Sequence, residues 1–444
     1  MDLLRLDREI ESANVALTRW RARLSRGDET AWTEAPLDSR RDAQGKRLRD
    51  TLASLKPPLS ELALRAGLVL WVETLTVARI TAEAEVAYAQ ADHEAIGHLH
   101  LEKLAMVSAH DAIRGLVAAS SRIEAQRYLD AIAECAPALR EAAARLRETA
   151  REVRLRFAID PPDAHGLGDG ALLTAVSASA RAFLRLTNDL AKDELTRRRR
   201  VANVETETWP FALDLSRARG ATEGWPTRLS ARFLDETFRP WCAGVKIPPL
   251  RLPEAHGGAS FAIAFARFGQ ALRHAYAPRA LPFVLRRPPV FVDTDRFGFL
   301  FASLLASARF SSRRLGLSQR VALAQSRAFA AAFLIEARRT AAKLSRLAGA
   351  PADELAHDVY DEIHPASALF FESTDVVASV GRALALFTVL PLHDELRDRH
   401  DEDWFDNPRS IVELRSRSAI PSSESAPAKG AESDLAKRFE DALR

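Results

Sequence analysis

The chain has 444 residues, a formal net charge of +3, 47% hydrophobic residues and 28% charged residues. This length allows one large core or a few domains, and the composition is that of an ordinary soluble protein. The charge is too small for this length to indicate nucleic-acid binding. The two cysteines, Cys135 and Cys242, form neither a disulfide framework nor a metal knuckle, which favours a reducing compartment.

The first residues, MDLLRLDREIES, lack the basic-then-apolar order of a signal peptide. The most apolar run, 62–80, contains Arg65, Glu73 and Arg79, which is typical of a buried helix and not of a membrane span. We therefore expect a cytoplasmic protein without membrane insertion.

Helical periodicity covers the first 160 residues, which we interpret as an N-terminal helical region. This region is either a lid over a cleft or a helical scaffold. We expect helices at 3–24, 48–91, 92–119 and 121–157, with breaks at Pro57-Pro58 and Pro137.

Turn-forming residues cluster at 159–166, and we place there the start of a second unit, 161–415. The run GLGDG at 166–170 precedes a predicted helix at 171–200. It lacks the third glycine, the preceding strand and the Lys-Ser/Thr pair of phosphate loops, so we interpret it as a plain loop.

Apolar residues recur at steps of three and four between 260 and 276, in SFAIAFARFGQALRHAY. Phe261, Phe265, Phe268 and Leu272 share one face at this spacing. The segment is therefore predicted to be a core-facing helix.

The part FARFGQALRH resembles the active-site helix of the thimet oligopeptidase and oligoendopeptidase F family of zinc peptidases, which are gluzincin-like and carry the pattern H-E-x-G-H-A-L-H. Gly269 and Leu272 keep the frame of that pattern. The resemblance implies zinc-binding histidines at Ala266 and Gln270 and a general-base glutamate at Arg267.

A second segment, DTDRFGFLFASL at 293–304, resembles the family's V-T-E-G-Y-A-F-L-F-E-H-L, and Asp295 falls at the third zinc ligand. A late segment resembles F-Y-S-A-R-Y-L-R-A, with Val376 and Val380 at its tyrosines and Arg382 within the frame. EDWFDNP at 402–408 is similar to the family's G-E-D-W-W-R-N-P. The resemblance covers about residues 170–415.

These positions lack the chemistry that the resemblance implies. Ala266 has no donor atom, Gln270 is a poor neutral ligand, and Arg267 stays protonated and so cannot act as a base. Valines at 376 and 380 cannot donate to an oxyanion. We therefore expect no zinc and no other cofactor, and an Arg267–Asp295 salt bridge where the metal would lie.

The fold implied is mainly α and multi-helical, with one small β-sheet beside the degenerate active-site helix. We expect that sheet at 241–252, where Pro248 and Pro249 remove two N–H donors and so weaken peptide docking by strand addition.

A rebuilt site in the same cleft is the alternative. A relocated metal or acid–base site would draw on His256, His274, Asp295, His364 and Glu372. The residues that we expect to line the cleft are Arg267, Arg273, His274, Asp295 and His364.

The C-terminal part is predicted to be a flexible linker at 416–432 and a short amphipathic helix at 433–444. Its apolar stripe, Leu435, Phe439 and Leu443, either docks on a partner or folds back on the chain.

The sequence thus predicts a peptidase-like protein without peptidase activity, a pseudopeptidase that binds or scaffolds a protein or peptide partner. The alternatives are a hydrolase with a rebuilt site and an assembly component recruited by its last helix.

Overall fold

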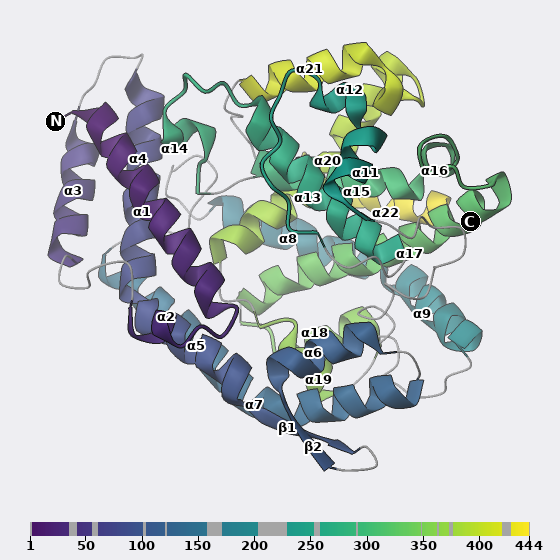
Figure 1. Ribbon diagram of the computed structural model, residues 1–444, viewed down its shortest axis with the longest axis horizontal. Coiled ribbons are helices and arrows are strands. Elements are labelled where there is room, and N and C mark those ends of the chain that lie inside the picture. Colours follow the sequence, from purple (N-terminus) through teal and green to yellow (C-terminus); the bar gives the residue numbers. More distant parts are fainter. Residues whose placement is uncertain are drawn as a thin grey trace.

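The structure is a computed structural model that describes residues 2–34, 42–55, 61–100, 104–119, 122–157, 171–202, 229–252, 258–289, 292–347, 349–361, 364–372, 376–419 and 428–443. Over these ranges the protein is mainly helical with one two-stranded antiparallel sheet, which confirms the predicted fold class (Figure 1).

The N-terminal part places α1 beside α4 at one end of the molecule, and the long helix α7 runs from there toward the sheet (Figure 1). The Asp2 carboxylate caps α1 by accepting from the N–H of Arg5. The elements are α1 (Leu3–Leu24), α2 (Thr30–Thr33), α3 (Asp42–Ser54), α4 (Leu62–Ile80), α5 (Ala82–Glu94), β1 (Ile96–His100), β2 (Leu104–Ser108), α6 (Ala109–Ala118) and α7 (Arg122–Arg156).

The predicted helix at 92–119 is wrong, because a hairpin of β1 and β2 interrupts it. The hairpin pairs Ile96 with Ser108 at its base and lies against α7. A Cβ on Gly97 would lie 2.1 Å from the carbonyl oxygen of Ala131, so this close approach requires glycine. The predicted break at Pro137 is also wrong, since α7 continues through it.

The second part is built around α13, which packs along α15 near the centre of the molecule (Figure 1). The predicted helix at 171–200 is two helices that meet at Thr187. The elements are α8 (Ala171–Leu186), α9 (Asn188–Ala202), α11 (Ala231–Thr237), α12 (Arg239–Cys242), α13 (Gly258–Tyr276), α14 (Phe283–Arg286), α15 (Val292–Ser303), η3 (Leu304–Ala306), α16 (Ala308–Leu315), α17 (Gln319–Leu347), α18 (Ala352–Tyr360), α19 (Pro365–Leu369), α20 (Val376–His400), η4 (Trp404–Asp406), α21 (Pro408–Ala419) and α22 (Ala431–Leu443).

The predicted buried face of α13 is confirmed. Phe261, Phe265, Phe268 and Leu272 are all fully buried. The Phe268 ring stacks on Phe238 with centroids 4.6 Å apart. Burial of so many aromatic side chains fixes α13 firmly in the larger hydrophobic core.

The small sheet lies elsewhere than predicted. Among the described residues the only sheet is β1–β2 in the N-terminal part, whereas residues 243–252 form no strand. Pro248 and Pro249 carry no N–H, which is the physical reason that this segment cannot form a regular ladder there.

The C-terminal helix packs on its own chain, against α8, α17 and α20. Leu435, Phe439 and Leu443 are 1%, 5% and 4% exposed. The structure therefore shows the fold-back arrangement, in which these side chains are not available to a partner. Helix α21 also continues to Ala419, past the predicted linker start at 416, and residues 420–427 lie outside the described ranges.

The two parts of the chain are tied together by Asp7 of α1, which is 6% exposed. Its carboxylate accepts from the main-chain N–H groups of Phe283 and Val284 at 2.8 and 2.9 Å. Phe283 and Val284 also belong to the hydrophobic cluster of α1, α4 and α5. The division of the chain near residue 160 stays a prediction.

No helix in the described part of the chain is long and apolar enough to cross a membrane.

Candidate functional site

The site begins where α13 and α15 touch. A Cβ on Gly269 would lie 2.4 Å from the carbonyl oxygen of Phe297, and one on Gly298 would lie 3.3 Å from that of Ala266. Two glycines therefore allow the helices to approach closely. This approach brings Gln270 against Asp295, and the Gln270 Nε2 donates a hydrogen bond to Asp295 Oδ1 at 3.0 Å.

Two of the three positions at which the sequence resemblance implies zinc ligands are thus in contact, and the third, Ala266, lies one turn before Gln270 on α13. The residues present do not fit a catalytic zinc ion. Ala266 has no donor atom, and Gln270 turns amide hydrogens, not a lone pair, toward Asp295. Burial raises the pKa of Asp295, against the opposing effects of the Arg382 charge and the Gln270 hydrogen bond, which disfavours the anionic form that a metal requires.

The predicted Arg267–Asp295 salt bridge is wrong. Arg267 Nη1 donates to the main-chain carbonyl of Arg251, and no ion pair joins Arg267 to Asp295, both of which the structure describes. Burial and the nearby Arg251 charge lower the pKa of Arg267. Arg267 therefore adds positive charge at the edge of α13 without neutralising the remaining carboxylate.

Arg273 and His274 lie in the last turn of α13 but have different surroundings. Arg273 is 5% exposed and its Nη2 donates to Asp293 at 3.3 Å, so it belongs to the protein interior. His274 faces the cavities described below. Burial, with the charges of Arg287 and Arg273, lowers the pKa of His274 to about 4, so its imidazole is neutral near pH 7.

Two cavities meet beside α13. The smaller, about 390 Å³, lies between the segment 248–251 and α13, and Arg251, Arg267 and Gln270 line it. The larger, about 610 Å³, lies between the N-terminal helices α1, α4, α5 and α7 and the chain after α13. His274 and Arg287 line both, so we treat the two as one cleft.

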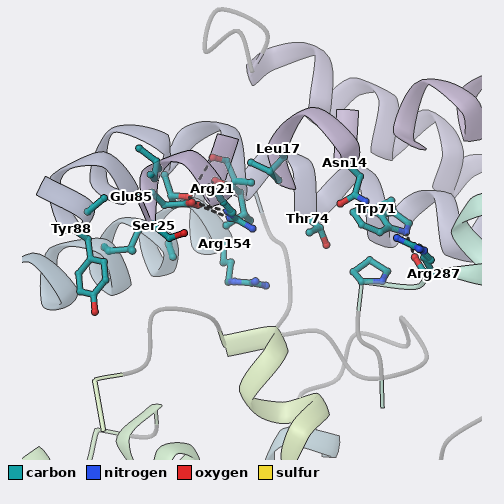
Figure 2. A pocket seen from close by; sticks show the side chains of 18 of the residues that line it. Asn14, Leu17, Arg21, Ser25, Trp71, Thr74, Glu85, Tyr88, Arg154 and Arg287 are labelled. Carbon is teal, nitrogen blue, oxygen red and sulfur yellow. Dashed lines mark hydrogen bonds and ion pairs between the residues drawn. The ribbon is translucent and has the colours of Figure 1, made fainter. Parts of the chain in front are cut away.

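Figure 2 shows the larger cavity, with Tyr88 and Arg287 toward opposite ends of the view. Arg21 faces Glu85 in the middle, and the two form a bidentate ion pair, with Arg21 Nη2 2.6 Å from Glu85 Oε1. Trp71 Nε1 donates to the Arg287 carbonyl at 2.7 Å, which fixes the chain after α14 against α4.

The structure does not assemble the other predicted residues here. His364 caps α19, where its Nδ1 accepts from the N–H of Ala366 at 3.2 Å. Glu372, with a 2% exposed side chain, is held by Arg147 and by Arg346 at 3.1 Å. His364 and Glu372 therefore have capping and ion-pair roles in packing, and His256 lies outside the described residues.

The positions at which the sequence resemblance implies oxyanion tyrosines lie on α20. Val380 is 1% exposed and apolar, and Val376 lies in the first turn of the helix. A valine at either position offers no hydrogen-bond donor.

The sequence reasoning missed the N-terminal wall of the cleft. Its residues Arg21, Trp71, Glu85 and Arg154 come from four helices that are distant in sequence. No local motif marks them, because the cavity exists only once the helices pack together.

The fold is similar to that of a solved structure described as an oligoendopeptidase. A "putative oligoendopeptidase F from Bacillus anthracis str. Ames" superposes with a TM-score of 0.55 at 10% sequence identity, over 91% of this chain and 83% of that chain. Models of known protein families gave no match, and neither did a search of curated proteins. The structural similarity therefore shows a shared fold, one related to that of the peptidases.

Proposed function

We propose that this protein is a non-catalytic, peptidase-like binding protein whose cleft holds a peptide or protein segment without cleaving it. The observation that carries this proposal is the Gln270–Asp295 hydrogen bond. The amide of Gln270 and the carboxylate of Asp295 lie at two ligand positions of the resembled zinc site and bond to each other. Arg267 lies at the position of the general base.

The cleft favours an acidic ligand. The smaller cavity is lined by Arg251, Arg267 and Arg287, and no carboxylate is among its described lining residues. Burial, followed by the charge of Arg286, lowers the pKa of Arg287, just as burial and Arg251 lower that of Arg267. Positive charge that is incompletely compensated is stabilised by an anionic partner. A segment rich in Asp and Glu, or a free C-terminal carboxylate, has this chemistry.

Fluorescence anisotropy with labelled peptides tests the proposal. We expect an acidic peptide to bind and a lysine-rich peptide of equal length not to bind, with the acidic peptide recovered intact. The double variant Arg251→Gln, Arg267→Gln should bind it more weakly, whereas Arg181→Gln, on α8, serves as the matched control. Cleavage of peptide bonds by the native protein that a chelator abolishes would contradict the proposal.

A hydrolase with a rebuilt acid–base pair is the second candidate, because the neutral His274 imidazole lines both cavities and Asp295 is bonded to Gln270, one turn before His274 on α13. Peptide cleavage that resists chelators and disappears in Asp295→Ala would favour it.

We propose a cytoplasmic location for either function. Both cysteines are free thiols, and Cys135 is buried, which suits a reducing compartment.

A further inference from the structure

Three potential metal ligands meet outside the former zinc site. Asp92 and His93 lie in the last turn of α5, and His110 lies in the first turn of α6. His110 Nδ1 is 3.2 Å from Asp92 Oδ2, and the rings of His93 and His110 have centroids 4.6 Å apart. One donor atom from each of the three residues lies within 4.8 Å of the other two.

The His93 ring is partly buried and incompletely bonded. Its Nε2 is buried and has no hydrogen-bond partner among the described residues. On the other side of the ring, a Cβ on Gly27 would lie 3.0 Å from His93 Nδ1, and Gly27 has a positive φ of 70°. Gly27 thus leaves room for the ring, and the buried nitrogen lacks the partner that such groups normally have.

We propose that Asp92, His93 and His110 bind a divalent transition-metal ion, with zinc as the probe ion. Two imidazoles and a carboxylate form a common three-ligand zinc set, and imidazole favours such ions over magnesium or calcium. Zinc with bonds of about 2.1 Å holds its ligand atoms roughly 3.4 Å apart. The donor atoms of Asp92, His93 and His110, which lie within 4.8 Å of one another, would reach this spacing by rotation of the side chains.

The position of the cluster gives the ion two consequences. The ligands bracket the hairpin, because Asp92 and His93 on α5 precede β1 and His110 on α6 follows β2, so the ion would clamp the base of the hairpin. Asp92 also lines the larger cavity, together with Glu85, Tyr88 and Ala89 on the same face of α5. Tyr88, one turn before Asp92, lies toward the end of the cavity away from Arg287 in Figure 2. The metal site would therefore lie at the Tyr88 end of the larger cavity.

Zinc titration of the chelator-treated full-length protein, followed by calorimetry and by thermal unfolding, tests the proposal. We expect one equivalent of zinc and a higher Tm with zinc. His93→Gln and His110→Gln should each weaken zinc binding at least tenfold and remove the rise in Tm. His357→Gln, which removes an exposed histidine from α18, should change neither.

Two further measurements keep the test decisive if a histidine variant unfolds. Asp92→Asn preserves side-chain size and should still weaken zinc binding, and X-ray absorption of the native zinc complex should show two imidazole ligands. Absence of stoichiometric zinc in the native protein, or full zinc binding by a folded His93→Gln, His110→Gln double variant, would overturn the proposal. The metal site does not depend on peptide binding, so either proposal can fail alone.

Discussion

The two faces of helix α13 compare differently with the resembled peptidase pattern. On the core face, Phe261, Phe265 and Phe268 are fully buried, and Gly269 allows contact with α15. On the cleft face, Arg267 and Gln270 stand where the resembled peptidases carry a base and a ligand. Dense packing constrains nearly every atom of a core face, whereas side chains on a cleft face can differ without disturbing the core. A peptidase-like fold can therefore persist around a site with different chemistry.

The cluster of Asp92, His93 and His110, here called the α5–α6 cluster, shows the opposite combination, with donor atoms present outside the resembled frame. There, two histidines and an aspartate offer metal ligands in a region that the sequence resemblance does not cover. The α13–α15 contact has the helix packing of the resembled site without its donor atoms, whereas the α5–α6 cluster has donor atoms without that packing. The backbone frame of a site and the donor atoms within it are therefore separate properties.

The largest effect is expected from Gly269→Ala on the core face. Alanine normally stabilises a helix relative to glycine by about 1 kcal/mol. Here its Cβ would meet the Phe297 carbonyl at 2.4 Å, so we expect a net loss of roughly 2–3 kcal/mol in the free energy of unfolding, measured by urea denaturation. Arg267→Ala, on the cleft face, should change it by no more than about 0.5 kcal/mol. Equal effects of the two variants would contradict the distinction between the faces.

Asp7→Ala tests a buried contact that shapes the cleft. The Asp7 carboxylate holds α1 against the chain after α13. It leaves the buried N–H groups of Phe283 and Val284 without their acceptor, at a cost of about 2–3 kcal/mol. Glu9→Ala, on an exposed position of α1, is the control for the same measurement. A loss confined to a few tenths of a kcal/mol would show that the contact is dispensable.

The pH dependence of stability tests His274 on the cleft side. Its pKa is about 4 in the folded protein and about 6.5 when unfolded, so the unfolded chain binds the proton more tightly. The contribution of the neutral His274 to the free energy of unfolding is therefore present above pH 6.5 and is lost as the pH falls toward 4. His274→Gln should reduce the loss between pH 7 and pH 5 by on the order of 2 kcal/mol.

The matched variant is again His357→Gln, whose side chain is exposed and which should keep the native pH profile. Superimposable profiles of the native protein and His274→Gln would mean that His274 is not buried in the neutral form.

The smallest effect is expected from single cleft arginines. Arg267→Gln should weaken binding of the acidic peptide by about fivefold, or roughly 1 kcal/mol, because one cation at a partly exposed site contributes modestly. The loss should shrink at high salt, measured by anisotropy at two ionic strengths. If neither the substitution nor added salt changes the affinity for the acidic peptide, the cleft has no electrostatic role in binding.

The sequence predicted α13 and its buried face because a single periodic helix carries its own signal. It also assigned positions 270 and 295 to one site, through two motifs with the family's spacing, but it predicted Arg267 and not Gln270 as the partner of Asp295. It failed at the hairpin, because the fit of Gly97 against Ala131 depends on a helix distant in sequence. It failed likewise at Arg267, whose partner is a main-chain carbonyl that no motif specifies. The N-terminal wall of the cleft could not be predicted, since four separate helices build it.

The zinc content of two engineered proteins tests the central claim most directly. Both carry His93→Gln and His110→Gln, so that any zinc at the α5–α6 cluster is removed, and one also carries Ala266→His, Arg267→Glu, Gln270→His and Asp295→Glu. We predict no bound zinc in the first and about one equivalent in the second, because the frame of α13 and α15 persists while its donors are missing. One equivalent of zinc in the first protein, or none in the folded second protein, would contradict the account.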